Sequence, residues 1–196
     1  MNWKMIFGFQ FLKDKKAGRK WAEEQRQSEL QEMPVITDPE VEALRQYVKE
    51  KWTMGESHGL SHWDNVYKNG LLLQDDGVNE RVVQRFAYLH DFCKQDDVTD
   101  REHGPRVAEW MVSIRDTLLR SLSDEEFHLL QEACRLHTST ERTGDPTIDA
   151  CFDADRLDLG RVGITPTPNK MATEKGRHLA MKKKLDIKNA YPNFMT

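Results

Sequence analysis

Side chains that bind divalent metal ions occur in four short stretches of this chain. These stretches contain His62, the adjacent pair His90-Asp91, His137, and Asp155 within an aspartate-rich run from 153 to 158. Imidazole nitrogens and carboxylate oxygens together form the ligand set that hard or borderline divalent ions prefer. The sequence therefore indicates a metal site, provided that the fold brings these stretches together.

Helix signals surround these residues and no strand pattern of period two is evident. Helix starts are predicted at Asp38-Pro39, at a capping box of Ser61 with Asp64, at Asn79, near Pro105, at Ser123 with Glu126, and at Asp145-Pro146. The helix that begins near Pro105 is expected to run to about residue 119. Six or more helices without strands predict an all-α fold, a single helical bundle with the metal site in its core.

Three of the candidate ligands share a helix face with apolar residues. His90 comes four residues after Phe86, and His137 comes three residues after Cys134. Asp155 lies on the apolar face of the last core helix, where a carboxylate is costly without a partner. The alternative for each residue taken alone is an ordinary core histidine or an aspartate that caps local backbone.

The order of these residues, a His, then a His-Asp pair, then an Asp, resembles the HD-domain superfamily of metal-dependent phosphohydrolases over about residues 57–163. The resemblance implies an all-α domain in which one ion is bound by His62, His90, Asp91 and Asp155. Asp155 matches the family motif better than Asp153 or Asp158 because of the letters ADRL around it. Those two aspartates are expected at the surface or in support of a ligand.

Two further histidines fall where some members of that superfamily bind a second ion. These are His103 and His137, and in that arrangement Asp91 bridges the two ions and is also a catalytic residue. Single-ion members use similar histidines as phosphate contacts, so the sequence leaves one or two ions open. It also leaves open which divalent metal is bound, with manganese, magnesium, nickel, iron and zinc as the candidates.

Substrate contacts are expected from three residues near the predicted ligands. Lys94 completes a His-Asp-x-x-Lys pattern that recurs in the family near the substrate phosphate, which predicts a catalytic and substrate-binding role. His58, four residues before His62, and Arg156, beside Asp155, are the other candidate phosphate contacts. Lys94 could instead complement the end of its helix, and Arg156 could fix neighbouring acidic groups. The remaining histidines are expected at the surface: His128 and His178.

The composition describes a globular protein of one domain. The chain has 196 residues, of which 38% are hydrophobic and 32% are charged. An N-terminal extension over 1–35, an HD-type helical domain over 36–165 and a basic C-terminal tail over 166–196 are expected. Three cysteines lie in apolar helical patterns and are expected to be buried, reduced thiols: Cys93, Cys134 and Cys151.

Charge and hydropathy limit the classes of partner. The two ends of the chain are basic and the body between them is acidic, which argues against binding of duplex nucleic acid. The apolar run Met5–Leu12 is shorter than the roughly 18 residues that a membrane span needs, and it lacks a signal-peptide cleavage site. No transmembrane segment and a cytoplasmic location are therefore expected, and the oligomeric state stays open.

Together these features predict a metal-dependent phosphohydrolase that acts on a nucleotide or another small phosphorylated metabolite. Motifs for other chemistries, including a P-loop, a Rossmann glycine pattern and a serine nucleophile elbow, do not occur in the sequence. Two alternatives use the same residues. One is a di-iron oxygenase on the same helical scaffold, and the other is a non-catalytic, metal-stabilised domain that binds a nucleotide or a partner.

Overall fold

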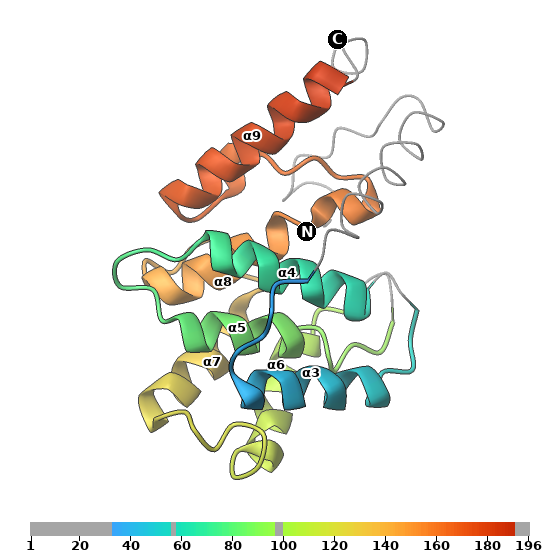
Figure 1. Ribbon diagram of the computed structural model, residues 1–196, viewed down its shortest axis with the longest axis vertical. Helices are drawn as coiled ribbons and strands as arrows, with labels where there is room; N and C mark the ends of the chain where they lie inside the picture. Colours follow the sequence, from blue (N-terminus) through green and yellow to red (C-terminus); the bar gives the residue numbers. More distant parts are fainter. Residues whose placement is uncertain (1–32, 56–57, 97–99, 191–196) are drawn as a thin grey trace.

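The computed structural model describes residues 33–55, 58–96 and 100–190, and this part of the chain contains seven α-helices and no β-strand. The all-α prediction is confirmed. The helices, labelled in Figure 1, are α3 (Pro39–Lys51), α4 (Leu60–Leu72), α5 (Glu80–Leu89), α6 (His103–Trp110), α7 (Asp124–Leu136), α8 (Pro146–Arg156) and α9 (Glu174–Ala190). Short 3₁₀ helices are η2 (Met111–Ile114), η3 (Leu159–Val162) and η4 (Pro168–Lys170).

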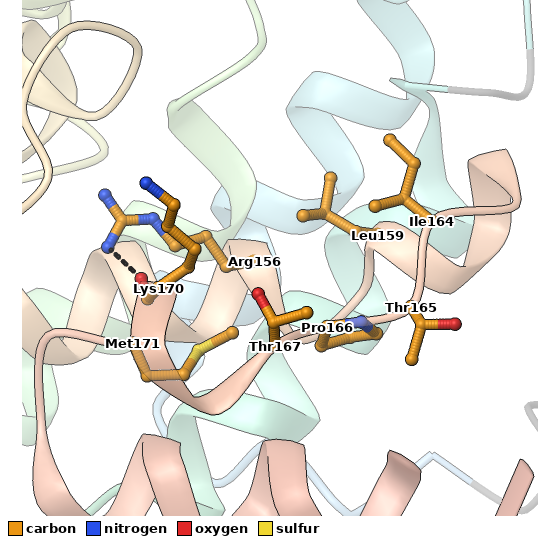
Figure 2. A pocket seen from close by; sticks show the side chains of 8 residues that line it. All are labelled: Arg156, Leu159, Ile164, Thr165, Pro166, Thr167, Lys170 and Met171. Carbon is orange, nitrogen blue, oxygen red and sulfur yellow. Dashed lines mark hydrogen bonds between the residues drawn. The ribbon is translucent and has the colours of Figure 1, made fainter. Parts of the chain in front are cut away.

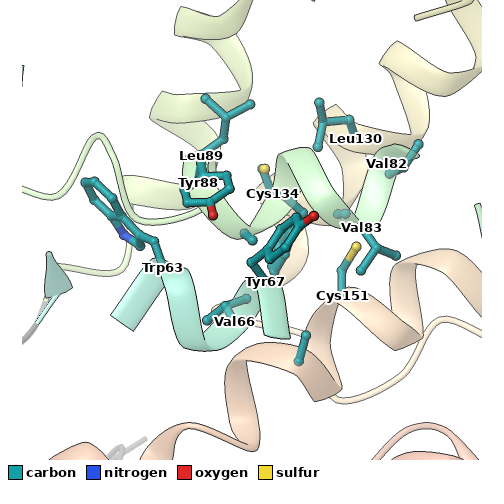
Figure 3. Packing of buried hydrophobic residues seen from close by; sticks show 14 of the residues in the cluster. Trp63, Val66, Tyr67, Val82, Val83, Tyr88, Leu89, Leu130, Cys134 and Cys151 are labelled. Atoms are coloured by element: carbon teal, nitrogen blue, oxygen red, sulfur yellow. The ribbon is translucent and has the colours of Figure 1, made fainter. Parts of the chain in front are cut away.

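Helices α4, α5, α7 and α8 pack around a common core. Helix α5 contacts α3, α4, α7 and α8, and α6 lies against α7. In Figure 1, α9 lies above α4, α5 and α8, and α3 lies below them. Figure 3 shows Trp63 and Tyr67 of α4 near Tyr88 of α5, and Cys134 and Cys151 facing the same interior from α7 and α8.

Four of the predicted helix starts are confirmed by side-chain caps. Asp38 accepts from the backbone of α3, Asn79 from α5, and Asp145 from α8, and Ser123 forms a capping box with Glu126 at α7. Each of these caps satisfies backbone N–H groups that have no partner within the helix. The helices that carry His90, His137 and Asp155 therefore begin where local sequence directs them.

The predicted capping box of Ser61 with Asp64 is wrong. Helix α4 begins at Leu60, and its N-cap is Gly59, which makes no side-chain cap hydrogen bond. The Asp64 carboxylate instead accepts two hydrogen bonds of 2.8 Å from Arg45 of α3. A bidentate, charge-assisted pair between two helices is stronger than a local cap, which explains the difference.

The single helix predicted from about 105 to 119 is shorter in the structure. Helix α6 begins earlier, at His103, and ends at Trp110, after which η2 and a series of turns follow. The Arg115 side chain donates to the backbone carbonyls of Leu119 and Leu122, at 2.7 Å each. These bonds join Arg115 to carbonyls four and seven residues further on and hold the chain in turns.

The segment after residue 165 contributes to the packed core. Met171, Ala172 and Ala180 are buried, although a basic tail was expected from 166 onwards. Asp153 anchors this segment by accepting from the backbone N–H of Ala172 and from both the N–H and the hydroxyl of Thr173, at 2.7–2.8 Å. The expectation that Asp153 lies at the surface or supports a ligand is therefore wrong.

The cysteines and the membrane prediction have clear outcomes within the described residues. Cys134 and Cys151 are buried and Cys93 is only half-buried, and all three are free thiols. Burial raises the pKa of each thiol, to about 11 for Cys93, which disfavours the nucleophilic thiolate.

None of the described helices is long and apolar enough to cross a membrane. The expected N-terminal extension and its apolar run Met5–Leu12 lie outside the described residues except for 33–35.

Candidate metal centre

Six side chains from five separate segments converge at the ends of their helices. His62 lies in α4 and Asp155 in α8, whereas His90 and His137 are the C-terminal caps of α5 and α7. Asp91 follows α5 directly, and His103 is the first residue of α6. The six are the residues that the resemblance assigns to metal binding, and the structure brings all of them together in two adjacent groups that could hold a metal ion.

The first group consists of His62, His90 and Asp155. The Nε2 atoms of the two histidines are 3.1 Å apart. Oδ1 of Asp155 lies 3.4 Å from Nε2 of His62 and 3.8 Å from Nε2 of His90. Both histidines are fully buried, while the Asp155 side chain is 22% exposed. The group is therefore a three-ligand cluster that is open to solvent on the side of Asp155.

The second group consists of Asp91, His103 and His137. Oδ1 of Asp91 lies 2.9 Å from Nε2 of His103 and 3.8 Å from Nε2 of His137. The two Nε2 atoms are 2.9 Å apart. All three side chains are buried. This group is therefore a second cluster of the same composition, two imidazoles and one carboxylate.

Asp91 connects the two groups through its two carboxylate oxygens. Oδ1 faces His103 and His137, whereas Oδ2 lies 3.6 Å from Nε2 of both His62 and His90. A carboxylate that presents one oxygen to each cluster has the geometry of a bridging ligand. The arrangement matches the binuclear version of the sequence prediction, in which Asp91 contacts both ions.

The outer nitrogens of the four histidines fix which ring nitrogen faces the centre. Nδ1 of His90, His103 and His137 lies 2.6–3.2 Å from a backbone carbonyl oxygen, which can only accept, so these Nδ1 atoms are the N–H donors. Nδ1 of His62 donates in the same way to Asp158, at 2.6 Å. The Nε2 atoms then point lone pairs at one another, as in metal sites where a neighbour fixes the tautomer.

Facing lone pairs at this separation require a positive charge between them. Either an additional proton lies between each pair of imidazoles, or a cation binds all of the inward nitrogens and carboxylates at once. Two nitrogen ligands at about 2.1 Å from an ion are about 3.0 Å apart at 90° and about 3.4 Å apart at the tetrahedral angle. The observed 3.1 Å and 2.9 Å are closer to the right-angled spacing. The spacing of the donor atoms in each group is therefore compatible with a shared metal ion.

Electrostatics keep three of the inward groups, His90, Asp91 and Asp155, in the protonation states that a metal needs. Burial lowers the pKa of His90 to about 3, so that ring is neutral. Burial would raise the pKa of Asp155, but the neighbouring His90, His62 and Arg161 hold it at about 2. Burial acts on Asp91 in the same direction, and the surrounding histidines nevertheless hold its pKa well below 3.8. Both carboxylates are therefore ionised at neutral pH.

His62 differs from His90 because it has carboxylate partners on both sides. Burial and the charge of Arg161 oppose its protonation, but hydrogen bonds with Asp158 and Asp91 outweigh them and raise its pKa. The facing lone pairs of the first group require a positive charge between them. When no metal ion is bound, a proton on His62 supplies that charge.

Asp158 supports His62 from behind the first group. Its carboxylate accepts from Nδ1 of His62 and, at 3.1 Å, from the side-chain amide of Asn65. The side chain is 3% exposed, so this aspartate supports a ligand and is not a surface residue. Carboxylate–histidine pairs of this kind orient the ring of a metal ligand and raise its basicity.

Two cationic or titratable side chains line the open side of the first group. Nδ1 of His58 lies 2.9 Å from Oδ2 of Asp91, and Nη2 of Arg161 lies 3.4 Å from the same His58 nitrogen. His58, expected as a substrate contact, therefore lies directly against the bridging carboxylate. Arg161 was not anticipated as part of the site.

The structure does not bring Arg156 to the centre. Its guanidinium is buried and donates to the backbone carbonyls of Thr140, Glu141 and Lys170, at 2.8–3.2 Å, and it stacks over Phe152. Figure 2 shows this side chain with its bond to Lys170, beside a small cavity of about 10 Å³. The expectation that Arg156 contacts substrate is therefore corrected to a structural role.

Lys94 lies on another side of the Asp91 turn. Its side chain lines an open surface cavity of about 550 Å³ together with Arg106 and Trp110. Among the described residues, no hydrogen bond or ion pair joins this side chain to the six ligands. Its catalytic role stays a prediction. His128 and His178 are exposed, as expected.

The sequence contains a signal for Asp158 and Arg161, the two site residues outside the predicted ligand set. Asp155, Asp158 and Arg161 follow one another at intervals of three residues. On a continuous helix this spacing keeps side chains on neighbouring positions of one face. The chain leaves α8 at Arg156 but continues in turns and the 3₁₀ helix η3, which preserves the three-residue period.

Comparisons with protein-family models, curated proteins and solved structures give no match.

Proposed function

We propose that this protein is a metal-dependent phosphohydrolase of the HD type, with two divalent ions held by the six converging residues. The observation that supports it most is the Asp91 carboxylate, whose two oxygens face two separate groups of ligands. Binuclear sites of this composition activate water and stabilise the charge of a phosphoryl group in transfer to water.

The ligands are suited to this chemistry because the chain preorganises them. Each of the four imidazoles is held from behind by a carbonyl or carboxylate oxygen, so that binding of ions needs little rearrangement. The divalent ions, when bound, lower the pKa of water and polarise a phosphoryl oxygen.

The substrate side of the reaction is assigned to the open side of the first group. Asp155 and His58 are the partly exposed residues there, at 22% and 14% exposed side-chain area. The ionised carboxylates would repel a phosphoester or phosphoanhydride that enters from this side, unless bound metal ions neutralise their charge. We propose a small phosphorylated metabolite as the substrate, with a nucleotide as the first class to test.

A di-iron oxygenase and a non-catalytic metal-binding domain use the same residues, and an assay separates the three. The full-length protein loaded with Mn²⁺ or Mg²⁺ is incubated with nucleoside mono-, di- and triphosphates and with sugar phosphates, in air and anaerobically. Hydrolysis consumes no oxygen and needs no redox-active ion, so phosphate release is expected in both atmospheres.

Two control variants sharpen this assay. His90→Ala is expected to abolish phosphate release, whereas His128→Ala, which alters an exposed histidine, is expected to leave it unchanged. Substrate-dependent oxygen uptake that requires iron would contradict the hydrolase and support the oxygenase. Absence of both activities in metal-loaded protein would support the binding domain.

A further inference from the structure

Arg161 is held beside the metal centre by a rigid local turn. It lies in η3, which ends at Gly163, a residue with φ of 77° in the left-handed region that glycine adopts without strain. The N–H of Ile164 donates back to the carbonyl of Leu159 at 3.1 Å and closes the turn. The guanidinium also donates to the carbonyl of Asp158 at 3.3 Å. The charge of Arg161 therefore has a fixed place in the fold.

This charge lies on the solvent-accessible side of the centre. The side chains of Asp155, His58 and Arg161 are 22%, 14% and 13% exposed, whereas those of His62 and His90 are fully buried. Arg161 contacts His58, and His58 contacts the bridging carboxylate of Asp91. A molecule that approaches the ligands from solvent therefore meets Arg161 and His58 at the same time.

A permanent positive charge at this place disfavours metal binding. Nη1 of Arg161 lies 3.6 Å from Oδ2 of Asp158, the oxygen that accepts from Nδ1 of His62. Nη2 lies 3.4 Å from Nδ1 of His58, which contacts Asp91. A positive charge this close to the ligands repels a divalent cation. A site that only stored a metal ion would bind it more tightly with a neutral residue here, whereas a site that also binds an anionic substrate gains from this charge.

We propose that Arg161, together with His58, binds the phosphoryl group of the substrate at the open side of the metal centre. The inference rests on the proposed function, because it names the residues that would recognise the substrate of that reaction. Guanidinium N–H donors are planar and suit the oxygens of a phosphoryl group, and an anion between Arg161 and two divalent ions offsets their mutual repulsion. Arg161 is then a specificity-determining residue for anionic substrates.

A purely structural role predicts a different outcome for the same variant. Nη1 of Arg161 lies 3.6 Å from Oδ2 of Asp158, the oxygen that accepts from His62. If Arg161 only neutralised and positioned Asp158, its removal would weaken metal binding through His62. If it binds phosphate, its removal would leave metal binding undiminished, because a repelling charge is lost, and would weaken anion binding alone.

The test measures metal and inorganic phosphate binding separately, by calorimetry on the full-length protein. Arg161→Met is compared with Arg161→Lys, which keeps the charge, and with Arg120→Met, which alters an exposed arginine on another segment. In Mn²⁺-loaded protein we expect Arg161→Met to weaken phosphate binding by at least about tenfold and Arg161→Lys to weaken it less. The Mn²⁺ stoichiometry of both is expected to equal that of the wild type.

Unchanged phosphate affinity in Arg161→Met, or loss of Mn²⁺ in that variant, would overturn the inference. If the wild type turns over a substrate and Arg161→Met has the same KM for it, the inference about Arg161 is overturned. The proposed hydrolase then still stands. If the wild type hydrolyses no phosphorylated compound, but its phosphate affinity still falls in Arg161→Met, the anion site stands and the proposed reaction fails.

Discussion

Nδ1 of His62 and Oδ2 of Asp158 are 2.6 Å apart, so a carboxylate outside the two groups holds a histidine of the first group. This contact turns Nε2 of His62 toward the first group and connects α4 to the turn after α8. The orientation of the buried His62 ring thus depends on the side chain of an aspartate outside the two groups.

The first prediction follows from this contact. Asp158→Ala removes the acceptor, so the His62 ring loses its fixed tautomer, and Mn²⁺ affinity is expected to fall by about 10- to 100-fold. Asp158→Asn keeps an acceptor oxygen and is expected to show a smaller loss. Isothermal calorimetry measures both, with Asp116→Ala, an exposed aspartate, as the control. Wild-type affinity in Asp158→Ala would show that His62 needs no support.

The second prediction concerns the close approach of α6 to α7 at Gly104. A Cβ atom at Gly104 would lie 2.6 Å from the carbonyl oxygen of Cys134 and 3.4 Å from the His137 ring. Gly104→Ala therefore pushes apart the helices that carry His103 and His137, at an overpacking cost of about 1–3 kcal/mol.

Occupancy of the second group should fall while that of the first group is retained. Elemental analysis after equilibrium dialysis against Mn²⁺ is expected to show a decrease from two ions toward one for Gly104→Ala. Glu109→Ala, an exposed position on the same helix, is expected to keep both. Two ions bound with wild-type affinity in Gly104→Ala would mean that the helix crossing does not position these ligands.

The third prediction concerns stability in acid and involves no metal ligand. Arg85 is fully buried and donates to Asp38 at 2.8 Å and to Glu40 at 2.7 Å. Burial would raise the pKa of both carboxyls, but their hydrogen bonds, including those from Arg85, outweigh it and lower both pKa values. The folded pKa values lie below the ordinary 3.8 of Asp38 and 4.5 of Glu40. This stabilisation is therefore present above pH 4.5 and is lost as the pH falls further.

Arg85→Met tests that assignment. At pH 7 it is expected to lower the free energy of unfolding by about 1–3 kcal/mol, less than for a fully buried pair because both carboxylates are partly exposed. Urea unfolding at pH 7 and pH 3.5 measures the difference from the wild type, which is expected to shrink at the lower pH. A difference that stays constant with pH would show that packing of the Arg85 side chain, and not its charge, stabilises the fold.

The fourth prediction concerns Lys94. Lys94→Ala is expected to lower the turnover of phosphate release without changing the Mn²⁺ stoichiometry, since the lysine is a predicted phosphate contact and not a ligand. The control is Lys49→Ala, which removes an exposed lysine from α3. Turnover equal to that of the wild type would remove Lys94 from the catalytic residues and leave it as part of the cavity with Arg106 and Trp110.

Sequence patterns predicted the helices that bear ligands because their starts are local features. Caps such as Asn79 and Asp145 act within one turn of backbone, and the three- and four-residue spacings that place His90 and His137 inward are equally local. The failed capping box at Ser61 shows the limit of such signals. Asp64 forms its contact with Arg45, nineteen positions away, and no pattern near Asp64 contains that information.

The same limit applied to the residues around the centre. Arg156 is expected at the substrate because it adjoins Asp155 in sequence, but adjacent helix positions point in different directions. Its carbonyl partners come from the loop at 140–141 and from Lys170 of η4. Asp153 likewise has its partners at residues 172 and 173. Contacts between distant segments decide these roles, whereas the six side chains that cluster in the structure are recognisable from residue types and their order.

Metal stoichiometry of wild type and Asp91→Ala tests the central claim most directly, because the Asp91 carboxylate presents one oxygen to each of the two groups. Full-length protein is stripped with chelator, equilibrated with Mn²⁺ by dialysis and analysed for bound metal, with circular dichroism to establish that both proteins remain helical. Two ions per chain are expected in the wild type, and loss of tight binding at both groups is expected in Asp91→Ala. One ion or none in the wild type, or two ions in folded Asp91→Ala, would contradict a binuclear centre bridged by this carboxylate.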